Sequence, residues 1–146
     1  MNLARALKLK NRLGQKIREL EEEVQKENSK RVGSIIKIKV DESMAELQKT
    51  INNLIKLKLA IFEASREMRE NILRLSENKS KIVFLKSIDT TEGKISSYEG
   101  ETEYEITYDK IYVKENIAKC EAEIDILQEE LDRFNHSTEV EVDIDM

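Results

Sequence analysis

The side chains that most often act as nucleophiles or metal ligands are scarce in this sequence, which contains one cysteine, Cys120, and one histidine, His136. Metal sites built from paired cysteines or clustered histidines are therefore excluded by number. A Ser-His-Asp triad would have to use His136, which has no evident nucleophile beside it. Cys120 falls in the apolar register of a helical pattern, which is typical of a small buried hydrophobic residue. We therefore predict no catalytic residue and no metal site, and we expect that the protein is not an enzyme.

The sequence also lacks the motifs that bind phosphate groups or calcium. Its four glycines are dispersed, and neither a G-x-G-x-x-G nor a G-x-x-x-x-G-K-[ST] segment occurs. The acidic runs Glu21–Glu23 and Glu129–Glu130 lack the alternating D-x-[DN]-x-[DN]-G spacing of a calcium loop. Such runs are typical of solvated helix faces, and we predict no cofactor.

The basic start of the chain is the clearest signal for an external ligand. Six cations and no acid lie from Met1 to Arg18, whereas sixteen acids and four bases lie from Glu99 to Met146. The candidate anion-binding residues are Arg5, Lys8, Arg12 and Lys16. They could neutralise the phosphates of a nucleic acid or lie on an anionic lipid surface. We favour a third interpretation, in which these cations pair with acids of the same chain or of a second subunit.

Helical periodicity dominates the elements that must position these side chains. With 146 residues, of which 39% are hydrophobic, the chain fits one domain that spans 1–146. Apolar residues at alternating intervals of three and four predict helices at 2–28, at 42–87 with a possible break near 70–78, and at 110–134. The stripe of the first helix is Leu3, Ala6, Lys10, Leu13, Ile17, Leu20 and Val24. The stripe of the third helix is Val113, Ile117, Cys120, Ile124, Leu127, Leu131 and Phe134.

The second helix carries more apolar residues than one narrow stripe can hold. Its predicted stripe is Met44, Leu47, Ile51, Leu54, Lys58, Ile61, Ser65, Met68, Ile72 and Leu75. Ile55, Leu59 and Phe62 lie beside this stripe and widen it, so this helix should touch more than one neighbour. We predict that these three residues mediate homo-oligomerisation, with a two-fold dimer as the expected state. In the alternative, a monomeric bundle has a kinked second helix that folds the extra residues onto the core.

Three short segments alternate between apolar and polar residues, which predicts strands near 35–40, 102–108 and 138–144. The first segment carries lysines on its polar face, and the other two carry acids, which suits cross-strand pairing. A loop of about ten residues that contains Gly93 and Gly100 should precede the second strand. We expect a small sheet or hairpin at one end of the helical bundle.

Together these patterns predict a mostly α protein, an antiparallel bundle or coiled coil of three main helices with a small β-hairpin or short sheet at one end. No stretch reaches the roughly 18 apolar residues that a membrane span needs. The single cysteine fits a reducing compartment, and we predict a cytoplasmic location. The predicted function is that of a non-enzymatic, self-associating structural or adaptor protein. The alternatives are a nucleic-acid-binding accessory protein and a membrane-active, lysin-like protein.

Two parts of the sequence resemble a known family. The C-terminal part combines Glu103-Tyr104-Glu105-Ile106 with a helix ending in Leu127 to Phe134 and with the segment Asn135-x-x-Thr138-Glu139-Val140. The beginning, Met1-Asn2-Leu3-Ala4-Arg5-Ala6-Leu7, is also similar. These segments resemble the septicolysin-like family of small bacterial proteins. The resemblance implies a helical fold.

Overall fold

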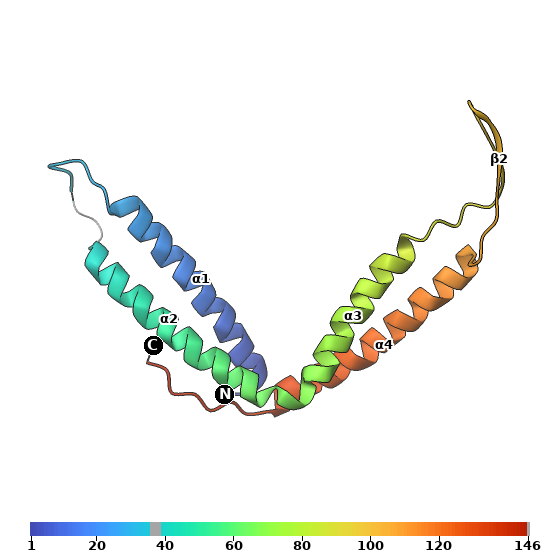
Figure 1. Cartoon of the computed structure of the whole chain (residues 1–146). Helices are drawn as coiled ribbons and strands as arrows, with labels where there is room; N and C mark the ends of the chain where they lie inside the picture. The colour runs from blue at the N-terminus through green and yellow to red at the C-terminus, as the bar shows by residue number, and fades with distance from the viewer. Residues whose placement is uncertain (36–38, 146) are drawn as a thin grey trace. The chain divides into compact units, whose positions relative to one another are not determined.

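The protein is mostly helical. A computed structural model describes residues 1–35 and 39–145, and about 70% of these residues are in helices. The elements in chain order are α1 (Leu3–Glu27), α2 (Val40–Ala64), a 3₁₀ turn η1 (Arg66–Met68), α3 (Arg69–Lys86), β1 (Gly93–Ser97), β2 (Gly100–Tyr104) and α4 (Lys110–Ser137) (Figure 1). The predicted mostly α class with a small β-hairpin or short sheet is thereby confirmed. Among the described residues, four helices are present where three were predicted, because the second predicted helix is divided into α2 and α3.

The chain divides into two compact units, where the sequence predicted one domain. Unit 1 comprises Met1–Glu67 and Asp132–Met146, and unit 2 comprises Met68–Leu131. The chain passes from unit 1 to unit 2 at η1 and returns within α4. The two units therefore bury separate sets of side chains, and each is described by itself.

Unit 1 is built on an antiparallel hairpin of α1 and α2, which lie side by side (Figure 1). The helix α1 begins at Leu3 because the Asn2 side chain caps it, accepting a hydrogen bond of 2.9 Å from the backbone N–H of Arg5. The apolar stripe predicted for this helix is confirmed, since its leucines and alanine are buried. The core cluster consists of Leu3, Ala6, Leu13, Leu57, Ile61 and Val140.

The inner face of α2 differs from the predicted stripe. Its buried positions are Ser43, Thr50, Asn53, Leu57 and Ile61, while Met44 of the predicted stripe is half exposed. The polar residues can be buried because each finds a partner. The hydroxyl of Thr50 donates to the carbonyl oxygen of Glu46 at 2.7 Å, and that of Ser43 donates to the Glu23 carboxylate at 3.2 Å.

The break in the second predicted helix lies earlier than expected. The sequence predicted a break near 70–78, but α2 ends at Ala64 and α3 begins at Arg69. Ser65 takes φ −92° and ψ 7°, outside the helical region, and its hydroxyl donates to the carbonyl oxygen of Phe62 at 3.3 Å. A serine that satisfies the last carbonyls in this way competes with helix continuation.

Residues 138–145, here called the C-terminal strap, lie along the α1/α2 hairpin. The backbone N–H of Leu3 donates to the carbonyl oxygen of Thr138, and that of Val140 donates to the carbonyl oxygen of Met1, both at 2.8 Å. The Asn53 side-chain amide donates to the carbonyl oxygen of Asp145 at 2.7 Å. The strand predicted at 138–144 is therefore wrong. Apart from a bridge between Asn2 and Glu139, the segment pairs with no strand in the described part of the chain. Its alternating apolar residues pack on helices instead.

Unit 2 contains the hairpin of α3 and α4, whose buried residues are Leu75, Leu85, Cys120 and Leu127. The stripe predicted for the third helix is confirmed, because all seven of its residues are buried or half-buried. Polar contacts join the two helices. The side-chain amide of Asn71 donates to the Glu130 carboxylate at 2.9 Å, and the Arg74 guanidinium nitrogen lies 3.8 Å from a Glu123 carboxylate oxygen. The helix α4 continues to Ser137, beyond the predicted end at residue 134.

The small sheet of unit 2 is a hairpin of β1 and β2, and it is assembled from neighbouring segments. The strand predicted at 102–108 begins and ends earlier, at Gly100–Tyr104, and its partner is Gly93–Ser97, which the sequence predicted as a loop. The strand predicted at 35–40 falls largely on residues 36–38, which lie outside the described residues, and Val40 is already helical.

Candidate self-association and anion-binding surfaces

The two side chains most able to do chemistry are Cys120 of α4 and His136 in the last turn of the same helix. Cys120 is buried, and the Nδ1 atom of His136 lies 2.7 Å from the carbonyl oxygen of Asp132 in its own helix. Within residues 1–35 and 39–145, no three histidine, cysteine or acidic side chains are placed to hold a metal ion.

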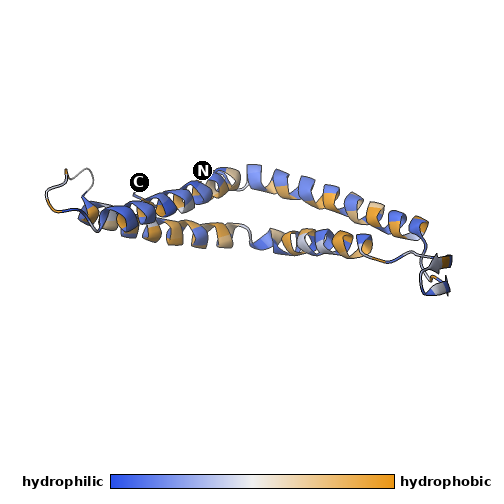
Figure 2. Ribbon diagram, turned by 90° about the horizontal axis from the view of Figure 1, so that it is seen from above, coloured by the Kyte–Doolittle hydropathy of each residue, from blue (hydrophilic) through white to orange (hydrophobic). Residues whose placement is uncertain are grey.

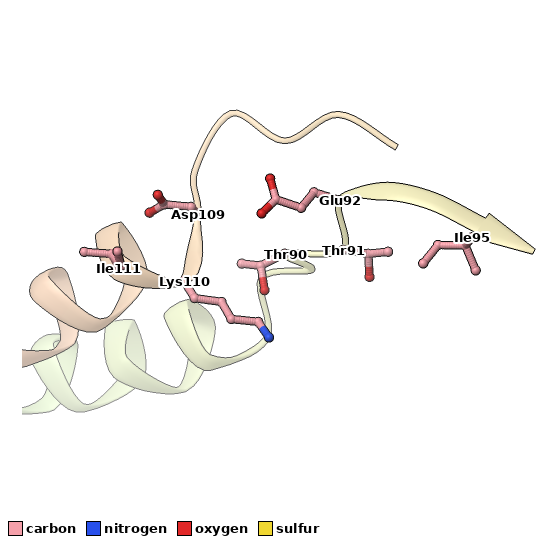
Figure 3. A pocket seen from close by; sticks show the side chains of 7 residues that line it. All are labelled: Thr90, Thr91, Glu92, Ile95, Asp109, Lys110 and Ile111. Carbon is pink, nitrogen blue, oxygen red and sulfur yellow. The ribbon is translucent and has the colours of Figure 1, made fainter. Parts of the chain in front are cut away.

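A depression of about 440 Å³ lies where β1 and the loops of unit 2 meet the first turn of α4. Its lining residues are Thr90, Thr91, Glu92, Ile95, Asp109, Lys110 and Ile111 (Figure 3). Asp109 caps the N-terminus of α4, since its side chain accepts a hydrogen bond of 2.8 Å from the backbone N–H of Tyr112. Thr91 donates to Asp89 through its backbone and its hydroxyl, and these bonds lower the pKa of Asp89. In Figure 3 these side chains come from a loop, from β1 and from the first turn of α4, and they do not converge on one point.

The outward side of α2 carries a row of exposed apolar residues, here called the α2 outer face: Met44, Ile55, Leu59 and Phe62. Ile55, Leu59 and Phe62 are 53%, 64% and 59% exposed, whereas Leu57 of the same helix is 0% exposed. The sequence predicted these three as the residues left over from the core, and the structure places them outside it. Figure 2 shows hydrophobic residues recurring along this helix between hydrophilic ones.

The four candidate anion-binding residues of α1 separate into two groups. The Lys16 ammonium group donates to the Glu46 carboxylate at 2.6 Å. This hydrogen bond, together with the charge of Lys16, lowers the pKa of Glu46. Arg5, Lys8 and Arg12 are exposed and form no ion pair within the described part of the chain. With Met1 and Leu9 they line a depression of about 430 Å³.

A second group of cations was missed by the sequence analysis. Lys10 and Arg18 of α1 and Lys58 of α2 line a depression of about 290 Å³ together with Asn11, Gly14 and Leu54. A signal for it was present, because Lys10 and Lys58 are the lysines that interrupt the two apolar stripes. A lysine at a stripe position lies at the edge of the helix contact, where its stem packs and its ammonium group reaches water.

Unit 2 also exposes apolar residues that the sequence analysis did not single out. Leu73, Val83 and Phe84 of α3 and Ile111 and Ile126 of α4 are each more than half exposed. The rings of Tyr108 and Tyr112 are stacked, with centroids 4.2 Å apart.

No helix of the described residues has the length and apolar character to cross a membrane. Comparisons of the chain with protein-family models, curated proteins and solved structures found no match.

Proposed function

We propose that the protein is a non-enzymatic, self-associating structural or adaptor protein whose copies join through the α2 outer face. The observation that carries this proposal is the exposure of Ile55, Leu59 and Phe62 beside a helix face that is already packed. Exposed apolar residues that form a contiguous patch mark interaction sites. The cytoplasmic location, the resemblance to the septicolysin-like family and the membrane-active alternative stay predictions.

A second copy of α2 fits the α2 outer face. If two α2 helices pack antiparallel through their outer faces, with the two-fold axis at the height of residue 53 along the helix, Met44 lies opposite Phe62 of the second copy, and Ile51 lies opposite Ile55. The same register places Gln48 opposite Lys58, so no like charges oppose each other in the seam. One patch meeting its own copy is the usual geometry of a two-fold dimer.

The test introduces a charge into this face without touching the core. We expect Ile55→Glu or Phe62→Glu to weaken self-association by about a hundredfold, equivalent to about 2.8 kcal/mol, because each places a carboxylate in an apolar contact. Sedimentation equilibrium at micromolar concentration measures the mass. Ala45→Glu is the matched control, since Ala45 is also exposed on α2 but lies off the face.

Helix content from circular dichroism should be the same in all these variants. A wild-type chain that remains at 17.0 kDa as its concentration rises would contradict the proposal. Equal masses for wild type and Ile55→Glu would contradict the assigned face.

The unpaired cations of α1 favour a second candidate function, that of a nucleic-acid-binding accessory protein. Arg5, Lys8 and Arg12 recur at intervals of three and four, so they lie on one exposed side of α1. Cations in such a row bind the phosphate backbone without reading its sequence. Lys16, which lies one turn further, is already paired with Glu46.

Fluorescence anisotropy with a labelled DNA duplex tests this candidate at several salt concentrations. If it holds, the double variant Arg5→Gln, Arg12→Gln should weaken binding on every sequence and lower the slope of log K against log salt by about two. Lys16→Gln should change the slope less, because Lys16 already has a carboxylate partner. Binding that is absent at low salt would reject this function.

A further inference from the structure

The hairpin of β1 and β2 is a sheet with two open edges. In the described part of the chain these two strands form a complete sheet by themselves, and all ten of their residues are exposed. A lone two-stranded hairpin is marginally stable in water, and its outer backbone groups are a template for another strand. We propose that β1 pairs with β1 of a second copy, so that two hairpins form one four-stranded antiparallel sheet. This inference rests on the proposed self-association but uses a different surface.

The registers of the two edges distinguish β1 from β2. Full-length antiparallel pairing of β1 with its own copy centres on Ile95, so that Ile95 meets Ile95 and Lys94 meets Ser96. The same pairing of β2 centres on Thr102 and places Glu101 opposite Glu103 twice. Like charges directly opposite destabilise a strand pair, whereas two β-branched residues stabilise it. The glutamates therefore protect the β2 edge, and the β1 edge is left open for pairing.

Pairing of β1 with β2 of the second copy is the strongest competing arrangement, because it would set Lys94 opposite Glu103, as within the hairpin. However, the two acidic strands would then flank a single strand, about 10 Å apart. In the order β2-β1-β1-β2 they lie about 14 Å apart, so screening over a Debye length of about 8 Å at physiological salt weakens their repulsion further. The two-fold arrangement also closes the sheet at two protected edges, whereas the competing one leaves an open β1 edge at one end.

The faces of the hairpin suit this sheet. Residues directly opposite in the register share a face, so Ile95, Thr102 and Tyr104 lie on one face, and Lys94, Ser96, Glu101 and Glu103 lie on the other. Ile95 and Tyr104 are 45% and 46% exposed. In the four-stranded sheet the two Ile95 side chains form the centre of a continuous apolar face, with Thr102 and Tyr104 of each copy beside them.

The experiment uses complementary charges at the predicted two-fold axis. Ile95→Glu and Ile95→Lys are each made in the full chain that also carries Ile55→Glu, so that the α2 contact is removed. Sedimentation velocity should show each variant at least about tenfold weaker in association than the chain with Ile95, because like charges meet at the axis. An equimolar mixture of the two should recover pairing, because the introduced carboxylate of one copy then meets the introduced ammonium group of the other. Ile95→Thr, which is β-branched and uncharged, is the control and should retain pairing.

Each outcome decides the inference separately from the proposed α2 contact. Recovery in the mixture supports pairing of β1 with β1. A mixture that associates no better than its components overturns it, and association that persists in both single variants points to pairing of β1 with β2 instead, where the substituted position meets Thr102. If the α2 proposal fails, Ile55→Glu alone leaves the mass of the wild-type chain unchanged, and recovery in the mixture of the two Ile95 variants is still observed.

Discussion

Replacing Leu57 with alanine should lower the free energy of unfolding of unit 1 by about 3 kcal/mol. Leu57 is 0% exposed and packs in the core cluster with Leu3, Ala6 and Ile61. Truncating a fully buried leucine loses its transfer free energy and leaves a cavity, which together cost about 2–5 kcal/mol. Because the chain has two compact units, a single global transition is not assured. Hydrogen exchange of peptides from α1 and α2 therefore measures the loss directly.

The matched control is Leu59→Ala, two residues further along the same helix. Leu59 is 64% exposed, so its truncation should change the stability of a monomeric chain by less than about 0.5 kcal/mol. Both substitutions are compared in the Ile55→Glu chain, in which the α2 contact is weakened. Equal losses from the two leucines would contradict the helix orientation described for α2.

The sequence predicted the helices α1 and α4 well because each has one apolar stripe. The predicted range 2–28 compares with Leu3–Glu27, and 110–134 compares with Lys110–Ser137. The end of α4 was missed because Asn135 is a common stop residue. In the structure the backbone continues in helical bonding past Asn135, since the N–H of Thr138 donates to the carbonyl oxygen of Phe134 at 2.9 Å.

The orientation of α2 could not be predicted because its apolar residues form two overlapping stripes. Leu57, its most buried residue, was absent from the predicted stripe, as were the buried polar residues Thr50 and Asn53 of its inner face. Their burial depends on hydrogen bonds that exist after folding, including the bond from Asn53 to the C-terminal strap. The surplus of apolar residues was itself visible, and this is why Ile55, Leu59 and Phe62 were found.

Of the strands predicted from period-two segments, the one at 102–108 overlaps β2, whereas the one predicted at 138–144 is wrong, and the partner of neither segment was predicted. Alternation shows that one side of a segment is buried and says nothing about what buries it. For the C-terminal strap the partner is a helical hairpin, and for β2 it is β1, a Gly-Lys-Ile-Ser-Ser segment of low strand propensity. In the same way, the pairing of Lys16 with Glu46 joins residues 30 positions apart and required the α1/α2 hairpin to be known.

Val140→Asn should release the C-terminal strap and cost unit 1 about 3 kcal/mol. Val140 is 3% exposed and belongs to the core cluster, while Val142 packs against that cluster. Burying a valine contributes about 1.5–3 kcal/mol, and an amide placed in the same apolar site costs a further 1–3 kcal/mol unless it finds a hydrogen-bond partner. Hydrogen exchange of the backbone N–H groups at positions 3 and 140 reports release of the strap, because these groups donate to the carbonyl oxygens of Thr138 and Met1.

Glu141→Asn separates the effect of position from that of the new side chain. Glu141 is exposed and follows Val140 directly, so the same asparagine there should leave the stability of unit 1 within about 0.5 kcal/mol of the wild type. If neither variant loses protection, the strap is held by its backbone hydrogen bonds and not by the packing of Val140. If only Val140→Asn loses protection, packing on the α1/α2 hairpin explains the alternation of apolar residues in this segment. The same variant should then also lower the melting temperature of α1 and α2 without a change in that of unit 2.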